Sequence, residues 1–287
     1  MKKIAWIGVG IMGKSMVRNL MKSGFELHIY ARTRAKVEEV ILDGAIFHST
    51  IDDCVKGCEA VITMVGYPRD VEEVYFTSGA ILDSAEPGAL LIDMTTTSPA
   101  LAEKLYAEGT QRGYRVVDAP VTGGDTGAKN GTLSILVGGD RADFETCMPL
   151  FRAMGTNINY QGGPGCGQHA KMANQIMIAG SLSGVCEALA YAKAKGLDLH
   201  VLINSLATGA AGSKQLDAFG EKIVAGDYAP GFFLKHFVKD MGLALEEAQA
   251  SGLTLDILDK VLENYRALEG EGFGDLGTQA LIKHYSG

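Results

Sequence analysis

The chain has 287 residues, of which 47% are hydrophobic and 21% charged, and this composition excludes disordered and fibrous proteins. Its formal net charge of -8, without a run of lysines or arginines, argues against nucleic acids or anionic membrane surfaces as partners. Five cysteines without a CxxC pair favour reduced thiols, and no stretch approaches the roughly 18 apolar residues of a membrane span. We therefore expect a cytoplasmic protein with room for two domains and no metal site.

The first half of the chain alternates short apolar runs rich in β-formers with helical patterns. This alternation predicts right-handed βαβ crossovers and a mostly parallel, doubly wound sheet of the α/β class. Strands are expected at residues 4–7, 26–30, 60–65, 89–93, 115–118 and 133–137. A helix is expected over residues 11–23, because Gly24 can end it as a C-terminal cap, and the pair Gly138 and Gly139 is interpreted as a plain turn.

The sequence changes character after the glycine-rich residues 162–167. Little β-rich sequence follows, and residues 170–195 predict one long helix rich in Ala, Ile, Leu and Met. Further helices are expected at residues 199–208, 213–225, 238–251 and 257–269. We place the domain boundary near Gln161, with a Rossmann-type domain over residues 1–161 and an all-helical domain over residues 162–287.

Gly8, Gly10 and Gly13 form a GxGxxG motif between the first strand and the first helix. In this context Gly8 permits the tight turn, Gly10 lets the backbone approach a pyrophosphate, and Gly13 lets the helix pack on the strand. The phosphates would rest on the helix N-terminus, which begins with Ile11 and Met12. Methyltransferases and flavoproteins use the same turn, so the motif alone favours a nicotinamide dinucleotide without establishing it.

The end of the second strand bears on the choice between NAD and NADP. An NAD site usually has an acidic residue there for the ribose 2'-hydroxyl, whereas this chain continues into Arg32, Thr33 and Arg34. Guanidinium and hydroxyl groups suit a 2'-phosphate, so we expect NADP(H), with NAD as the alternative. The segment alone is equally compatible with arginines that are solvated loop charges.

Thr122, Gly123 and Gly124 follow an apolar strand and a proline. Consecutive glycines after a hydroxyl residue expose backbone N–H groups, and such a concavity can hold the carboxylate of a substrate. A plain turn between strands is the alternative that this segment leaves open.

Lys171 follows two glycines at the start of the long helix. Gln175 shares its helical face at four residues, and Asn174 lies nearly on that face at three. A lysine beside amides in a partly desolvated cleft can give a proton to a carbonyl oxygen as hydride reaches the carbon. Helical spacing alone favours the other interpretation, a solvent-exposed lysine.

Five motifs in a fixed order make the chain resemble the β-hydroxyacid dehydrogenase family, which includes 3-hydroxyisobutyrate dehydrogenases, tartronate semialdehyde reductases and glyoxylate/succinic semialdehyde reductases. They lie at residues 8–13, 93–99, 118–133, 165–175 and 239–241, so the resemblance covers essentially the whole chain. It implies a Rossmann-type domain, a long interdomain helix that carries the catalytic lysine, and a helical domain that contributes to homodimer or homotetramer contacts.

On the substrate side, the resemblance implies that Lys171 is the catalytic acid and that Thr122 and Gly123 anchor the substrate. Phe232 and Asp240 match positions that border the substrate in semialdehyde reductases. The substrate implied is a small alcohol or aldehyde with a carboxylate.

On the cofactor side, the resemblance implies that Thr96 lies beside the nicotinamide ribose. Met64 and Val65 match residues on the adenosine side, and Lys239 matches a cofactor contact from the second domain. These residues join the glycine motif and Arg32 in the expected NADP(H) site.

The chain departs from the family pattern at two of these positions. The family usually has serine where this chain has Thr122, and many members have asparagine where it has Gln175. The second departure leaves open whether Asn174 or Gln175 supplies the catalytic amide. The pair of Asn174 and Gln175 is similar to that of tartronate semialdehyde reductases, but glyoxylate/succinic semialdehyde reductase and 3-hydroxyisobutyrate dehydrogenase activities stay open.

The leading hypothesis is an oxidoreductase that moves hydride between NADP(H) and a short β-hydroxy acid or its semialdehyde. A non-catalytic dinucleotide sensor or scaffold could use the same fold, but it has no need for Lys171 beside a carboxylate-binding loop. Decarboxylating dehydrogenation, as in 6-phosphogluconate dehydrogenases, fits less well, because those enzymes are longer and differ in both motifs.

Overall fold

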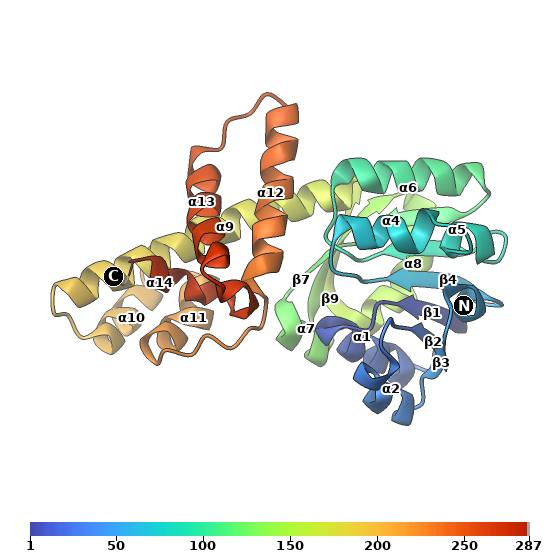
Figure 1. Cartoon of the computed structure of the whole chain (residues 1–287), viewed down its shortest axis with the longest axis horizontal. Helices are drawn as coiled ribbons and strands as arrows, with labels where there is room; N and C mark the ends of the chain where they lie inside the picture. The colour runs from blue at the N-terminus through green and yellow to red at the C-terminus, as the bar shows by residue number, and fades with distance from the viewer. Residues whose placement is uncertain (286–287) are drawn as a thin grey trace. The chain divides into compact units, whose positions relative to one another are not determined.

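The computed structural model describes residues 1–285 (Figure 1). Contacts within the chain divide it between Lys171 and Met172 into two compact units. One helix, α9 (Cys166–Ala194), runs through this division. The domain boundary expected near Gln161 stays a prediction.

The first unit is built on a nine-stranded sheet in the order β3-β2-β1-β4-β5-β6-β8-β7, with β9 paired to β8. Strands β3 to β6 along this order are parallel, β8 is antiparallel to β6 and β7, and β9 is parallel to β8. The strands are β1 (Lys3–Ile7), β2 (Glu26–Tyr30), β3 (Ile46–His48), β4 (Ala60–Thr63), β5 (Leu90–Asp93), β6 (Arg115–Asp118), β7 (Val121–Thr122), β8 (Leu133–Gly139) and β9 (Gly155–Gly162). The mostly parallel sheet expected from the alternating pattern is confirmed.

Helices cover both faces of this sheet, as Figure 1 shows for α1 and α2 on one face and for α4, α5 and α6 on the other. Side chains that alternate along one strand enter different cores, so Trp6 packs with Met16 of α1, while Ile7 packs with Tyr75 of α4. The helices are α1 (Ile11–Lys22), α2 (Glu38–Leu42), α3 (Ile51–Val55), α4 (Pro68–Phe76), α5 (Ile81–Ser84), α6 (Pro99–Gln111), α7 (Gly124–Asn130) and α8 (Arg141–Met154). Burial on both faces explains why the central strands are continuous apolar runs.

The interpretation of Gly138 and Gly139 as a turn is wrong, because both residues belong to β8 and pair with Asp118 and Val117. A Cβ atom on Gly138 would lie 2.5 Å from Asp118 Oδ1, so glycine is required here by close approach rather than by a turn. Three strands were not expected from the sequence. Two of them, β3 and β7, are very short, and β9 is largely polar with one exposed face.

The second unit is helical, as expected. After α9 come α10 (Leu199–Ala207), α11 (Lys214–Val224), α12 (Leu234–Ala250), α13 (Asp256–Gly270) and α14 (Ile282–Tyr285). Their apolar faces form one core around Leu182 and Leu189 of α9, Phe237 and Met241 of α12, and Tyr265 of α13. Helix α12 begins four residues earlier than expected.

Helix α9 also corrects the expectation about membrane spans. Over its 29 residues it is long and apolar enough to cross a membrane by length and composition alone. Core helices of soluble proteins pass the same test, and 44% of its most apolar window is buried inside the fold. The helix is therefore weak evidence for a membrane span.

Candidate functional site

Most of the expected cofactor and substrate residues of the first unit lie where strands end. Strands β1, β4, β5 and β6 are parallel, so their carboxyl ends meet at one edge of the sheet. The glycine turn follows β1, Met64 and Val65 follow β4, and Thr96 follows β5. Ligands of open α/β sheets bind at this edge.

The glycine turn has little room for side chains. Gly8 has a φ of +96°, and a Cβ atom there would lie 2.3 Å from the carbonyl oxygen of Met64. A Cβ on Gly13 would lie 2.6 Å from Gly8 O, to which the Trp6 indole Nε1 donates over 3.0 Å. Gly10, by contrast, has open space at its Cβ position and precedes the first turn of α1, where Ile11 is exposed. The turn thus presents bare backbone in the way that a pyrophosphate requires.

A pocket of about 600 Å³ lies beside this turn. It is lined by Val9, Gly10, Ile11, Lys14, Ala35, Lys36 and Glu39. The Lys14 ammonium pairs with Glu39 over 2.8 Å. The space next to the turn is therefore also lined by Lys14 and Lys36, two lysines that were not predicted from the sequence. Their positions, four residues after Gly10 and four after Arg32, are the signal that could have found them.

The Arg32 side chain is exposed to solvent and paired with a carboxylate. This side chain is 68% exposed, and Nη2 lies 3.2 Å from Asp70 Oδ1 at the start of α4. The other oxygen of Asp70 accepts a hydrogen bond from Tyr67 N over 3.0 Å, which fixes the carboxylate. Thr33 precedes a short 3-10 helix without capping it through its side chain. No sequence pattern indicates that an acidic residue lies beside Arg32.

Thr122, Gly123 and Gly124 form the end of β7 and the start of α7. The two glycines have φ values of +130° and +62°, which residues with a side chain rarely adopt. Thr122 is half-buried and Gly123 is exposed. The segment is thus a junction between a strand and a helix whose backbone only glycine adopts without strain.

Lys171 is buried, with 6% of its surface exposed, so the interpretation of an exposed lysine is wrong. Its Nζ donates a hydrogen bond to Val121 O over 2.9 Å. Val121 directly precedes Thr122, so the ammonium and the expected carboxylate anchor are joined through one residue of backbone. Helical spacing shows which residues share a face, but not what covers that face.

Two buried carboxylates, Asp118 and Asp93, accept hydrogen bonds from backbone groups near Lys171 and Thr96. Asp118 accepts hydrogen bonds from Gly165 N over 2.9 Å and from Gln168 N over 2.8 Å, at the start of α9. Asp93 accepts from the Thr63 hydroxyl over 2.7 Å and from Thr95 N over 3.0 Å. Burial raises the pKa of the Asp118 carboxyl, and it raises the pKa of Asp93 to about 6.

In the second unit, four expected site residues form a single chain of contacts. Lys239 Nζ lies 2.9 Å from Asp240 Oδ1, and Gln175 Nε2 donates to Asp240 Oδ2 over 2.6 Å. Asn174 Nδ2 donates to Gln175 Oε1 over 2.7 Å. Both ends of the Gln175 amide therefore bond within the protein, and the residue is 1% exposed. The half-buried ring of Phe232 stacks on the ring of His236, and the two ring centroids lie 6.4 Å apart.

Comparison with known proteins decides the family. Residues 3–163 match the family model described as the NAD binding domain of 6-phosphogluconate dehydrogenase. Residues 165–285 match the model described as NAD-binding of NADP-dependent 3-hydroxyisobutyrate dehydrogenase. The chain belongs to the β-hydroxyacid dehydrogenase family. It is therefore an NAD(P)-dependent oxidoreductase, and the Rossmann-type and helical organisation expected from the sequence is confirmed.

Relatives of this dehydrogenase match over nearly their whole lengths. An uncharacterized oxidoreductase of Bacillus subtilis is 48% identical and covers 98% of both chains. The NAD-dependent L-serine dehydrogenase of Pseudomonas aeruginosa is 36% identical, covering 96% of this chain and 95% of its own. The 2-hydroxy-3-oxopropionate reductase of Escherichia coli is 35% identical, covering 98% and 96%.

Among solved structures, the 3-hydroxyisobutyrate dehydrogenase of Mycobacterium tuberculosis with L-serine aligns with a TM-score of 0.89. It is 27% identical over 99% of this chain and 98% of its own. These names describe enzymes that act on small hydroxy acids or their aldehydes.

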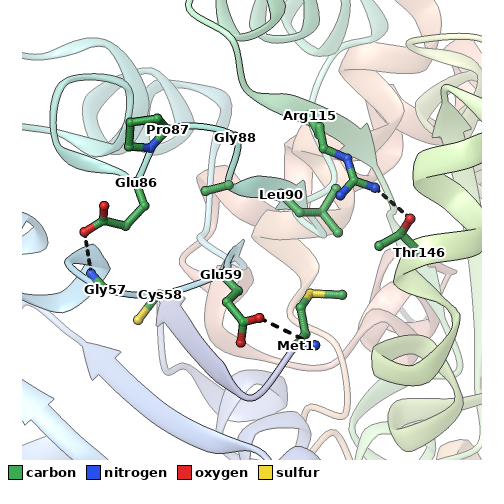
Figure 2. A pocket seen from close by; sticks show the side chains of 11 residues that line it. Met1, Gly57, Cys58, Glu59, Glu86, Pro87, Gly88, Leu90, Arg115 and Thr146 are labelled. Atoms are coloured by element: carbon green, nitrogen blue, oxygen red, sulfur yellow. Dashed lines mark hydrogen bonds and ion pairs between the residues drawn. The ribbon is translucent and has the colours of Figure 1, made fainter.

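A second pocket of the dehydrogenase, of about 340 Å³, lies at the opposite edge of the sheet, where β4, β5 and β6 begin (Figure 2). Its charged groups are all engaged with neighbours. Glu59 pairs with the amino group of Met1, Glu86 accepts from Gly57 N over 2.8 Å, and Arg115 binds Thr146 Oγ1 over 2.6 Å. This pocket therefore presents no charged side chain that is directed at a ligand.

Proposed function

We propose that this enzyme transfers hydride between NADP(H) and a short β-hydroxy acid or its semialdehyde, with Lys171 as proton donor and acceptor. The observation that supports this most is the buried Lys171 ammonium on Val121 O, one residue before Thr122. A buried cation at the ligand-binding edge of the sheet serves chemistry better than stability. The proposal covers residues 1–161 as the cofactor domain and residues 162–287 as the helical domain.

The residues around the glycine turn fit a dinucleotide. Gly8 and Gly13 have no room for a Cβ, and Gly10 is open in front of α1. We assign Gly8, Gly10, Ile11, Met12 and Gly13 to the pyrophosphate. Met64 and Val65 are assigned to the adenosine side, and Thr96 to the nicotinamide ribose. When bound, the reduced nicotinamide supplies the hydride.

The chain's own residues bind the substrate and move the proton. Thr122, with the backbone N–H groups of Gly123 and Gly124, binds the substrate carboxylate. In reduction, Lys171 Nζ gives a proton to the carbonyl oxygen, and in oxidation it takes the proton from the hydroxyl. The bond to Val121 O keeps Nζ oriented toward the residues that hold the carboxylate.

Contacts in the second unit support Asn174 as the amide that meets the substrate. Gln175 is bonded at both ends to Asn174 and Asp240, whereas Asn174 is half-buried. Gln175 and Asp240 then orient Asn174. We assign Phe232 to the border of the substrate site and Lys239 to the cofactor, as the family resemblance implies.

The names of the relatives narrow the substrate class. L-Serine, 3-hydroxyisobutyrate and 2-hydroxy-3-oxopropionate share a three-carbon acid with oxygen on C3 and differ in the group on C2. We propose a substrate with this scaffold, in which the carboxylate meets Thr122 and the C3 oxygen meets Lys171. Glyoxylate and succinic semialdehyde remain the alternative substrates to test.

The choice of NADP(H) over NAD(H) is supported by Arg32 and Thr33, and by Lys14 and Lys36 in the adjoining pocket. The pairing of Arg32 with Asp70 works against it, because a 2'-phosphate must compete with that carboxylate. We also propose a cytoplasmic homodimer or homotetramer. Its support is the set of exposed apolar side chains in the second unit, which includes Met177, Val201 and Ile257.

The test is an activity panel with Lys171→Ala. Wild type is assayed for oxidation of L-serine and 3-hydroxyisobutyrate with NADP+ and with NAD+, and for reduction of the semialdehydes named above and of glyoxylate with NADPH and with NADH. On the best substrate, Lys171→Ala should lose about 10²- to 10⁴-fold in kcat while the Kd of the cofactor stays near that of wild type. Lys260→Ala, an exposed lysine of α13, is the matched control and should keep full activity. Near-native kcat in Lys171→Ala would refute the assignment.

A further inference from the structure

Gln168 lies in the first turn of α9, three residues before Lys171, and is fully buried. Its Nε2 donates a hydrogen bond to Thr95 O over 2.7 Å, and its Oε1 accepts one from Thr97 N over 3.1 Å. One side-chain amide thus binds the two peptide groups on either side of Thr96. A neighbouring β-strand would satisfy the same pair of backbone groups, so the amide fixes the backbone conformation of Thr96.

The segment that Gln168 holds is also fixed on its other side. Thr95 N donates to Asp93 Oδ1, and the Thr95 hydroxyl accepts from Val65 N over 3.0 Å. These bonds tie the segment to the ends of β5 and β4, where the proposed cofactor contacts lie. The Gln168 side chain connects this segment to α9, the helix that carries Lys171.

The start of α9 is just as constrained. Asp118 accepts from the backbone N–H of Gly165 and of Gln168 itself. A Cβ on Gly167 would lie 2.5 Å from Leu136 O, so the helix start packs directly against the backbone of β8. The backbone of Gln168 is therefore fixed to β6, while its side chain is fixed to the segment after β5.

We infer that Gln168 is a positioning residue that sets the distance between Thr96 and the Lys171 ammonium. This inference rests on the proposed function, in which Thr96 borders the nicotinamide ribose and Lys171 exchanges the proton. Hydride and proton reach neighbouring atoms of one substrate, so both groups must be held in register. A displacement of about 1 Å can cost on the order of 10²-fold in rate.

Gln168→Met tests the inference, because it keeps most of the side-chain volume and removes both hydrogen bonds. The matched control is Tyr114→Phe, which removes a buried hydroxyl whose single proton is shared between Leu82 O and Ala85 O, before β6 at the opposite edge. The readouts are Tm, kcat and the kinetic isotope effect with cofactor deuterated at the transferred position. We expect Gln168→Met to lose about 10- to 100-fold in kcat with a larger isotope effect. Tyr114→Phe should lower Tm comparably and leave kcat within about twofold.

Gln168→Glu gives an independent readout. A neutral carboxyl can donate to Thr95 O and accept from Thr97 N as the amide does, whereas a carboxylate would repel Thr95 O. Burial raises the pKa of the introduced carboxyl, so a larger fraction of it is neutral as the pH falls. The ratio of kcat for Gln168→Glu to kcat for wild type should therefore rise toward low pH, and the ratio for Gln168→Met should not.

The outcomes separate this inference from the proposed function. If Lys171→Ala loses turnover while Gln168→Met matches Tyr114→Phe in kcat and isotope effect, the positioning role is overturned and the proposed function stands. A Gln168→Glu ratio that stays low at every pH overturns it as well. If Lys171→Ala keeps its kcat, the proposed function fails first, whatever Gln168 does.

Discussion

The two edges of the sheet in the first unit both carry charged residues, but they place them differently. At the edge where the parallel strands begin, Arg115 and Glu59 pair with neighbours while remaining partly exposed. At the edge where they end, Asp93, Asp118 and Lys171 are buried and bond mainly to backbone. Exposed pairs contribute little to stability, whereas buried charges are costly and persist where they have a task. The two edges therefore differ in the burial of their charged groups, and the buried set lies at the edge where the proposed site residues lie.

After the loss of turnover expected for Lys171→Ala, the next largest effect should come from the carboxylate anchor. Thr122→Ala removes the hydroxyl proposed to bind the substrate, and a lost partner of a charged group costs about 1 to 3 kcal/mol. KM for acid substrates should rise by about 5- to 150-fold, as measured by steady-state kinetics. Thr146→Ala removes a hydroxyl bonded to Arg115 at the other edge and should leave KM unchanged. Equal KM values in the two variants would remove Thr122 from the site.

The next largest effect should be on the preference for NADPH over NADH. Arg32→Gln removes the cation proposed to bind the 2'-phosphate, so the preference of kcat/KM for NADPH over NADH should fall by about tenfold. Asp70→Asn should increase that preference, because it frees Arg32 while its side-chain oxygen can still accept from Tyr67 N. Arg115→Gln removes an arginine that is likewise paired with an aspartate, and it should leave the preference for NADPH over NADH unchanged. Equal use of both cofactors by wild type would contradict the NADP assignment.

The smallest effect should be on how the free energy of unfolding depends on pH. The Asp93 carboxyl has a folded-state pKa of about 6, above that of an unfolded aspartate near 3.9. The folded protein therefore takes up this proton first, and Asp93 should add about 0.8 kcal/mol of stability as the pH falls from 7 to 5.5. Urea unfolding of wild type and Asp93→Asn at both pH values measures this difference. A difference between the two proteins that does not vary with pH would contradict it.

Asp83, an exposed carboxylate bonded to Arg112, supplies the contrast. The hydrogen bond from Arg112 lowers the pKa of Asp83, so its contribution to stability is lost only as the pH falls through that lowered value. Asp83→Asn should therefore leave the change in stability between pH 7 and 5.5 as it is in wild type.

Much of the fold could be predicted from the sequence because the central strands are buried on both faces. Strands β2 and β6 have the expected bounds, and β1, β4 and β5 differ from them by one or two residues. Strand β9 could not be predicted in this way, because its polar residues at an exposed position resemble a loop. The turn predicted at Gly138 is wrong because a close approach between strands and a turn both require glycine.

The candidate site was predictable only where a motif is local. The glycine turn lies within six residues, and its cramped geometry follows from its spacing. The bond from Gln168 to Thr95 spans 73 residues, and no sequence pattern indicates which backbone group a buried amide will find. The same applies to Lys171 and Val121. The roles assigned to these residues stay predictions until the variants are measured.

Trp6, the single tryptophan of the chain, is fully buried in β1 and hydrogen-bonded to the glycine turn through Gly8 O. Its indole emission therefore comes from one place, directly beneath the expected pyrophosphate. Reduced nicotinamide absorbs light where tryptophan emits, so a cofactor bound at this turn should quench the emission. If the cofactor binds as proposed, Trp6 would report its occupancy, and the emission could be titrated without a substrate and without a label.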